Sequence, residues 1–219
     1  MSDSAGETET DDGRERLVVY SDHVCPFCYL GRTSLAGYRA ERDDPLDVGW
    51  HPYDLRGHKR GPGGEIDDSV EDGKDETYFD QVRENVARLR EEYDAGEMLS
   101  IDDVPTVDSL DAQRVSLHVR EERPAAWATL DDALFEALWV DGRDVGDPEV
   151  LADVVASVGL PAGVAREALD DESTRERLLD QFAAARRYGV TGVPTFVYGD
   201  HAARGAVPPA HLRRLVEGV

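Results

Sequence analysis

The stretch Cys25-Pro26-Phe27-Cys28 contains both cysteines of this 219-residue chain. There is no third cysteine to complete a four-cysteine metal site or a network of structural disulfides. A disulfide between residues this close in the chain closes a very short loop and would therefore stabilise the fold little. We interpret the pair as a reactive dithiol rather than a structural cross-link.

The residues around this stretch predict a strand, a short loop and a helix, in that order. Residues 17–20 read Leu-Val-Val-Tyr, an apolar run typical of a buried strand. Residues 29–42 carry apolar side chains at near-helical spacing, namely Leu30, Leu35 and Tyr38. This order places Cys25 at the N-terminus of the predicted helix.

A helix N-terminus favours a thiolate, because its backbone N–H groups are unpaired and the helix dipole attracts negative charge. Pro26 suits the first helical turn, where its missing N–H costs nothing. Cys28 lies one turn further in. It is expected to be the more buried cysteine and to resolve a mixed disulfide formed at Cys25.

A zinc site is the alternative use of the pair, with His23 as a third ligand. The chain has no second cluster of Cys and His residues, and Pro26-Phe27 fits a zinc knuckle poorly. We predict no metal here and interpret His23 as a polar loop residue near the active site.

A second informative pattern covers residues 188–198, Tyr-Gly-Val-Thr-Gly-Val-Pro-Thr-Phe-Val-Tyr. A helix is expected to end at Gly189 and a strand to begin at Thr195. Pro194 comes directly before that strand, where a lost ladder donor is tolerated. On these grounds alone, Pro194 fits an ordinary trans strand start as well as a residue of the site.

Together the two patterns resemble the thioredoxin-like fold, and within it the DsbA-like proteins that include FrnE-type disulfide oxidoreductases. The resemblance covers residues 17–219, and three further stretches share it: residues 21–31, 134–147 and 205–209. It implies that Pro194 is cis and lies against the Cys25 sulfur, and that the Val193 backbone pairs with an extended substrate.

One stretch departs from the family pattern. Residues 107–114 read Val-Asp-Ser-Leu-Asp-Ala-Gln-Arg. Relatives usually have Asn-Ser or Asn-Thr here, followed by Ala-His-Arg, so both the Asn and the His are missing.

The expected fold class is α/β, a thioredoxin-like fold with a large all-helical insertion. Residues 1–14 are expected to form a disordered acidic tail, residues 15–55 and 189–219 the thioredoxin-like domain, and residues 56–188 the helical insertion domain, which begins with a solvated loop over 56–73. Strands are expected at 17–20, 46–53, 195–198 and 202–206, and helices at 29–42, 78–93, 110–122, 124–140, 148–158, 161–169, 173–188 and 209–217.

The composition and charge of the chain indicate which binding partners and which cellular compartment to expect. The chain has 47 acidic and 24 basic residues and a formal charge of -23, which disfavours nucleic acid and anionic membranes as partners. No apolar run approaches the ~18 residues of a membrane span, and residues 1–12 resemble no secretion signal, so we expect a cytoplasmic protein. With only two lysines, the composition resembles halophilic archaeal proteins; an acidic mesophilic protein is the alternative.

The leading functional expectation is a thiol–disulfide oxidoreductase acting on protein or peptide thiols and disulfides. Cys25 and Cys28 are the predicted catalytic residues, and the redox-active disulfide between them replaces any cofactor. Predicted substrate-binding residues are Pro26, Phe27, Val193 and Pro194. The sequence names neither the upstream redox partner nor the oligomeric state.

Two other classes of protein remain as alternatives. One is a glutathione-dependent isomerase or transferase related to 2-hydroxychromene-2-carboxylate isomerase or to the kappa-class transferases. Such enzymes usually keep a single Ser or Cys at the position matching Cys25, so the retained Cys28 argues against this class. The other is a non-catalytic binding or thiol-sensing module, which has no need of the intact dithiol together with Val193-Pro194.

Overall fold

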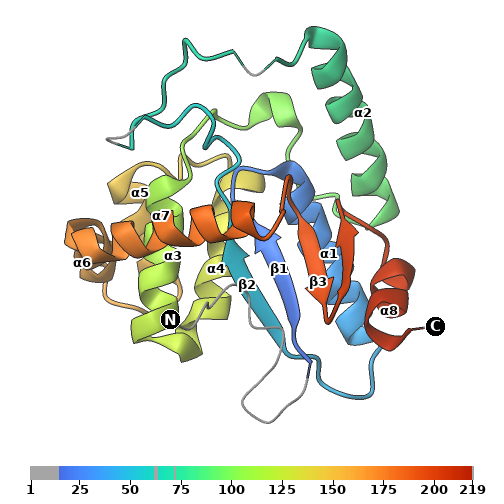
Figure 1. The fold of residues 1–219 in the computed structure, drawn as a ribbon. Coiled ribbons are helices and arrows are strands. Elements are labelled where there is room, and N and C mark those ends of the chain that lie inside the picture. Colours follow the sequence, from blue (N-terminus) through green and yellow to red (C-terminus); the bar gives the residue numbers. More distant parts are fainter. Residues whose placement is uncertain (1–14, 62–63, 72, 219) are drawn as a thin grey trace. The chain divides into compact units, whose positions relative to one another are not determined.

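The computed structural model describes residues 15–61, 64–71 and 73–218 (Figure 1). The expected acidic tail over 1–14 lies outside these residues. The chain divides into two compact units. We call residues 15–53 and 179–218 the sheet unit and residues 54–178 the helical unit. Among the described residues, no helix combines the length and the apolar character that a membrane crossing needs.

The sheet unit contains four strands in the order β2-β1-β3-β4. Strand β1 pairs with β2 in parallel and with β3 in antiparallel orientation, and β3 pairs with β4 in antiparallel orientation. The elements are β1 (Leu17–Ser21), α1 (Pro26–Ala40), β2 (Val48–Pro52), β3 (Thr195–Tyr198), β4 (His201–Arg204) and α8 (Pro209–Glu217), with the end of α7 (Glu172–Arg187).

Both faces of this sheet are apolar, because strand β1 alternates its side chains between them. Leu17 and Val19 join a buried cluster with residues of α1 and α8, whereas Val18 and Tyr20 join a second cluster with Ala185 of α7. All five residues of β1 are buried. Strand β1, which leads to the cysteines, is therefore packed against apolar side chains on both faces of the sheet.

The helical unit is built from α2 to α6 and the first part of α7. Asp75 and Asp147 cap two of its helices by accepting hydrogen bonds from Tyr78 N and Glu149 N, as expected for aspartate at an N-cap. Its elements are α2 (Glu76–Glu92), a 3-10 turn (Ile101–Asp103), α3 (Leu110–Glu122), α4 (Pro124–Trp139), α5 (Pro148–Ser157) and α6 (Gly163–Asp170).

Every predicted strand and helix has a counterpart among the described residues, and three spans coincide with the prediction: residues 110–122, 195–198 and 209–217. The strand predicted over 46–53 is shorter, Val48–Pro52, and the 3-10 turn was not predicted. Helix α1 begins at Pro26, as predicted from the place of Cys25 at the helix N-terminus and of Pro26 in the first turn, although the apolar spacing starts only at residue 29. The helix ends at Ala40 rather than at residue 42.

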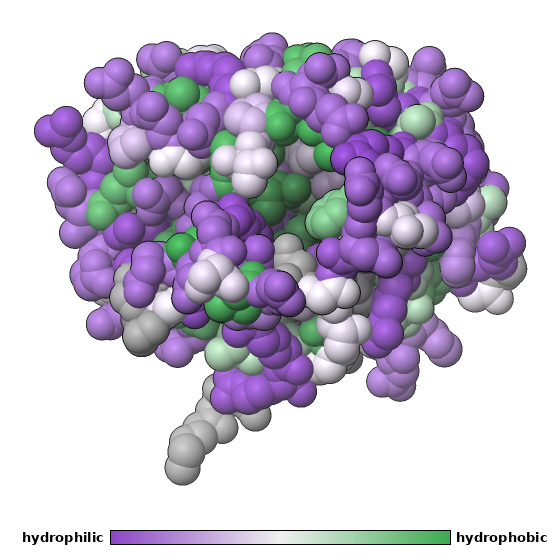
Figure 2. Space-filling view, turned by 90° about the horizontal axis from the view of Figure 1, so that it is seen from above, coloured by the Kyte–Doolittle hydropathy of each residue, from purple (hydrophilic) through white to green (hydrophobic). Residues whose placement is uncertain are grey.

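The negative charge is unevenly distributed between the two units. Residues 15–53 and 179–219 carry nine acidic and nine basic side chains, whereas residues 54–178 carry 33 acidic and 14 basic ones. Hydrophilic side chains cover most of the face shown in Figure 2. The unit that contains the cysteines is thus formally neutral, while the helical unit has a formal charge of -19.

Candidate functional site

Cys25 is the N-cap residue of α1, as the sequence predicted. Its N–H donates to the Asp22 carbonyl at 3.1 Å, and the Asp22 carboxylate accepts from Val24 N at 3.3 Å, so the loop after β1 is a tight, internally bonded turn. The Cys25 side chain makes no capping hydrogen bond. Its sulfur is thus placed at the positive end of the helix dipole without being used to cap the helix.

Cys28 lies in the first turn of the same helix, with its N–H 2.9 Å from the Cys25 carbonyl. Both cysteines are thiols and both are buried, with 3% of Cys25 and 1% of Cys28 exposed. Burial raises the pKa of the Cys28 thiol well above its ordinary value, and the hydrogen bond and charge of Cys25 raise it further. The Ser21 side chain and the Asp22 backbone act in the opposite direction.

The loop before β3 reaches the same place. The Cys25 thiol donates to the Val193 carbonyl with Sγ and O 3.5 Å apart, and the Val193–Pro194 peptide bond is cis. Thr195 Oγ1 donates to the Gly192 carbonyl at 2.7 Å, and Gly205 N donates to the Pro194 carbonyl at 2.8 Å. Two segments 168 residues apart in the chain thus form one site. The Val193–Pro194 loop is held in place by the hydrogen bonds of Thr195 and Gly205.

The other site residues of the sequence analysis are also in the sheet unit. Pro26 and Phe27 occupy the first turn of α1 and are both half-buried. His23 lies in the loop as predicted, but it is only 1% exposed, and its ring centroid is 6.2 Å from that of Trp50. Within the part of the chain that the structure describes, no three His, Cys, Asp or Glu side chains are arranged to hold a metal ion.

Gly31 is a residue that the sequence analysis did not single out by itself. A Cβ at this position would lie 3.0 Å from Pro194 Cγ and 3.2 Å from Phe196 Cζ, so helix α1 packs closely against the loop and strand that carry Val193. A glycine inside a helical pattern costs about 1 kcal/mol relative to alanine and often has a packing reason. That signal could have identified it.

Gly31→Ala is expected to lower the free energy of unfolding by about 1–2 kcal/mol, because overpacking costs more than the helix propensity of alanine returns. Gly37→Ala is the matched control on the same helix. Its Cβ would meet Pro209 Cγ at an ordinary 3.6 Å, so it should stabilise by up to ~1 kcal/mol. Urea unfolding of both variants measures the difference. Equal effects would show that the contact with Pro194 and Phe196 is not tight.

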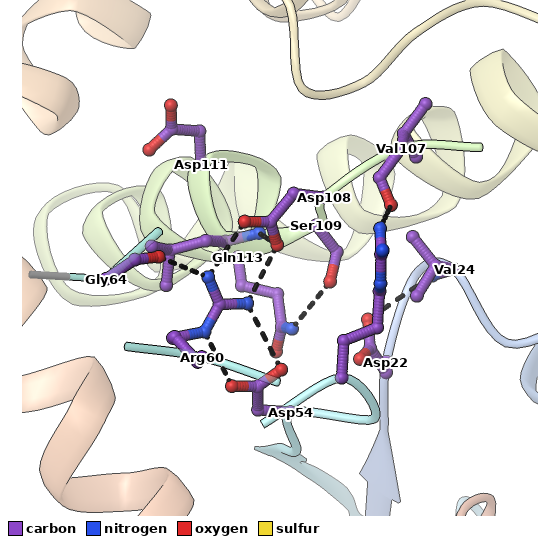
Figure 3. Close-up of polar contacts among 12 residues, drawn as sticks. Asp22, Val24, Asp54, Arg60, Gly64, Val107, Asp108, Ser109, Asp111 and Gln113 are labelled. Atoms are coloured by element: carbon purple, nitrogen blue, oxygen red, sulfur yellow. Dashed lines mark hydrogen bonds and ion pairs between the residues drawn. The ribbon is translucent and has the colours of Figure 1, made fainter. Parts of the chain in front are cut away.

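A separate polar cluster lies in the helical unit (Figure 3). The Arg60 guanidinium donates hydrogen bonds to both carboxylate oxygens of Asp54 and to both of Asp108. It also donates to the Gly64 carbonyl. Burial alone would lower the pKa of Arg60, but hydrogen bonds and charges from Asp108 and Asp54 hold it above its ordinary value. Arg60 thus joins the loop after residue 53 to the start of α3.

This cluster corrects the expectation of a solvated loop over 56–73 in part, since residues 67–71 and 73 are exposed but the Arg60 side chain is not. The loop has no helix or strand among its described residues apart from an isolated bridge between Arg60 and Ile66. However, the side chain of Arg60 is only 6% exposed and that of Asp54 only 2%. The composition of the loop suggested solvation, but its arginine is buried because two carboxylates neutralise it. Asp108, where relatives usually have Asn, is one of them.

A four-stranded mixed sheet, with a dithiol at a helix N-terminus beside a Val-Pro loop, defines a thioredoxin-like protein. The family model described as the DSBA-like thioredoxin domain matches residues 16–217. The chain belongs to this DsbA-like family, which is of the thiol oxidoreductase type, and the predicted fold class is confirmed.

Solved structures with the same fold have different activities. A Streptomyces coelicolor protein named as a probable DsbA oxidoreductase is 24% identical, with a TM-score of 0.72 over 93% of this chain and 88% of its own. A 2-hydroxychromene-2-carboxylate isomerase is 21% identical, with a TM-score of 0.66 over 87% and 88%. The cytosolic disulfide reductase DsbM of Pseudomonas aeruginosa, solved with GSH, is 22% identical, with a TM-score of 0.57 over 91% and 92%. At these identities the likeness shows the shared fold.

Proposed function

We propose that this chain is a thiol–disulfide oxidoreductase that acts on protein or peptide disulfides through Cys25 and Cys28. The observation that carries the proposal is the position of the two thiols in the first turn of α1, with the Val193 carbonyl 3.5 Å from the Cys25 sulfur. A backbone edge next to a reactive sulfur suits an extended peptide, whose main chain pairs there while its disulfide meets Cys25. Pro26 and Phe27, both half-buried, would border that peptide.

In the first step, the Cys25 thiolate attacks one sulfur of the substrate disulfide. A bond forms between Cys25 and that sulfur, the substrate disulfide breaks, and the departing thiolate takes up a proton. Cys28 stays protonated during this step, because burial and Cys25 both raise its pKa. The two cysteines therefore do not compete as nucleophiles.

In the second step, Cys28 loses its proton and attacks the Cys25 sulfur, so that the Cys25–Cys28 disulfide forms. The mixed disulfide breaks, the second substrate thiolate leaves and takes up a proton, and two electrons have passed to the substrate. Burial, the main cause of the raised pKa of Cys28, persists in the mixed disulfide, whereas the contribution of Cys25 is gone. Formation of the mixed disulfide thus removes one of the causes that keep Cys28 protonated. A thiol reductant returns the enzyme disulfide to the dithiol by the reverse steps.

The order of reaction is tested by alkylating the reduced protein with a limiting amount of iodoacetamide at neutral pH. We expect Cys25 to be labelled well before Cys28, because the raised pKa of Cys28 keeps it a thiol and the thiolate is the reactive form. Peptide mapping by mass spectrometry measures the two labels separately. Preferential labelling of Cys28 would reverse the assignment of nucleophile and resolving cysteine.

A thiol-dependent isomerase or transferase is the second candidate, and the fold shared with 2-hydroxychromene-2-carboxylate isomerase favours it. Such chemistry would need Cys25 but not Cys28. Turnover that survives the loss of Cys28 would therefore support this candidate over the oxidoreductase.

We also propose that the chain is of the FrnE type and works in a salt-rich cytoplasm. Support for the FrnE type comes from the Ser21–Gly31 stretch and from the Val193-Pro194 loop. The excess of acidic residues and the presence of only two lysines support the salt-rich environment. At about 1 M salt the Debye length is only ~3 Å, so repulsion between these charges is largely screened.

Lowering the salt from molar to millimolar concentration is expected to lower the unfolding temperature by more than roughly 5 °C. Because the formal charge of -19 lies in residues 54–178, amide hydrogen exchange should accelerate there first, while the formally neutral sheet unit changes less. An unfolding temperature that does not depend on salt would contradict the proposal of a salt-rich environment.

A further inference from the structure

Tyr188 is an exposed aromatic residue directly after the last residue of α7. Its side chain is 47% exposed, although most large apolar side chains of the described chain are buried. The backbone N–H of Tyr188 donates to the Ala184 carbonyl at 2.9 Å, so the residue belongs to the last turn of an ordered helix. Its exposure is therefore not that of a loose chain end.

One face of the Tyr188 ring packs against a buried aromatic ring. It stacks on Tyr20 with centroids 6.2 Å apart and an interplanar angle of 16°. Tyr20 is 1% exposed and in turn lies 4.6 Å from the His51 ring. Burial, with a smaller effect of Tyr188, raises the pKa of Tyr20 to about 12, so this support remains neutral at physiological pH. A rigid exposed aromatic ring loses little conformational entropy when it binds a ligand.

The Tyr188 ring is linked to the reactive sulfur through a buried cluster rather than by a direct contact. Val193 packs against the cluster that contains Tyr20, and the Val193 carbonyl accepts the hydrogen bond from Cys25. Tyr188 and Val193 are five residues apart, so the chain between them spans at most about 18 Å. An extended peptide that pairs with Val193 covers the same distance within about five residues.

The charge next to the ring indicates which peptides fit. Arg187 is exposed, and no other described residue forms an ion pair with it. This cation stands out in a chain whose formal charge is -23. It would attract an acidic side chain that the rest of the molecule repels.

We propose that Tyr188 and Arg187 form a specificity surface for an extended segment of a protein substrate, in which a large apolar residue and an acidic residue two positions away flank the disulfide, because residues i and i+2 of an extended chain share one face. This inference rests on the proposed function and adds the substrate class to it. The apolar side chain covers the accessible part of the Tyr188 ring, and the carboxylate meets the Arg187 guanidinium. The surface acts on substrate binding and takes no part in the exchange of sulfurs.

The test uses three disulfide peptides that differ only at two flanking positions with one common residue between them. Each peptide is named by the two residues that vary: Phe-Asp, Ala-Asp and Phe-Lys. We expect kcat/KM of the wild-type protein to be about tenfold lower for Ala-Asp and about threefold lower for Phe-Lys than for Phe-Asp. Tyr188→Ala should raise KM for the Phe-Asp peptide about tenfold and abolish the preference for Phe over Ala, whereas Tyr188→Phe should keep that preference. Phe79→Ala, which removes a similarly exposed ring in the helical unit, is the matched control and should change none of these values.

Two further measurements separate this inference from the proposed function. The small substrate 2-hydroxyethyl disulfide has no flanking residues and reports the exchange chemistry alone. Peptides with Ser in place of Cys report binding alone, and their dissociation constants should follow the same order. Failure of wild-type turnover with all disulfides would contradict the proposed function. Equal binding of all three Ser peptides, or an equal loss of both disulfide substrates in Tyr188→Ala, would overturn the role of Tyr188.

Discussion

Cys25→Ser is expected to lower the turnover of a peptide disulfide by at least about 10³-fold, because a hydroxyl at a helix N-terminus does not ionise at neutral pH and cannot replace a thiolate in disulfide exchange. Thiol release above the uncatalysed rate, with dithiothreitol as the reductant, measures the loss. The fold should be unchanged, since the Cys25 side chain makes no capping hydrogen bond and serine is close to it in size. A matching urea midpoint is the control.

Cys28→Ser separates the two steps of the same reaction. This variant keeps the nucleophile and loses the resolving thiol, so the mixed disulfide with Cys25 should accumulate and turnover should fall. Intact mass spectrometry detects the added half of the substrate. Turnover of Cys28→Ser within about twofold of the wild-type value would show that one cysteine suffices, which fits the isomerase or transferase candidate instead.

Arg60→Ala is expected to lower the free energy of unfolding by about 3–5 kcal/mol, the usual cost of removing one partner of a buried ion pair. The variant leaves the Asp54 carboxylate, only 2% exposed, without its cation, and it also removes the bonds to Asp108 and Gly64. Urea unfolding at neutral pH measures the change. Because these residues all lie in the helical unit, hydrogen exchange should accelerate there.

Two variants serve as controls for Arg60→Ala. Arg83→Ala breaks ion pairs with Asp80 and Asp102, but its side chain is 43% exposed, so it should lower the stability far less than Arg60→Ala does. Adding Asp54→Asn to Arg60→Ala should recover part of the loss, because the buried carboxylate is then neutral. A loss below about 1 kcal/mol in Arg60→Ala itself would show that Arg60 is not a structural cross-link of the loop.

The fold could be predicted from sequence where local patterns and global packing agree. The apolar run at Leu17–Ser21 is buried on both sheet faces, so nothing in the tertiary structure opposes its strand preference. Helix α3 and helix α8 were predicted with their exact bounds, because Ser109 and Pro208 stand before their first turns as start signals. The apolar spacing of α1 begins only at residue 29, but Pro26 as a first-turn residue predicted that the helix starts directly after Cys25.

The candidate site was predictable in part for a similar reason. The chain has only two cysteines, both within a stretch of four residues, so their spacing alone was enough to name Cys25 and Cys28. Val-Pro also occurs at residues 104–105 and 207–208, so Val193 and Pro194 were named through the family resemblance rather than from the local pattern. Burial of Arg60 and the stack of Tyr188 on Tyr20 depend on which side chains meet after folding. No local pattern carries that information, because the partners are 6 to 168 residues apart.

A redox titration of the wild-type protein tests the central claim most directly, namely that Cys25 and Cys28 act as one redox pair. The protein is equilibrated in buffers of reduced and oxidised dithiothreitol, and the remaining thiols are alkylated and mapped by mass spectrometry. The account predicts that both cysteines oxidise together, as a single two-electron couple that ends in the Cys25–Cys28 disulfide. Independent oxidation of the two cysteines, or a stable adduct at Cys25 while Cys28 remains a thiol, would contradict it.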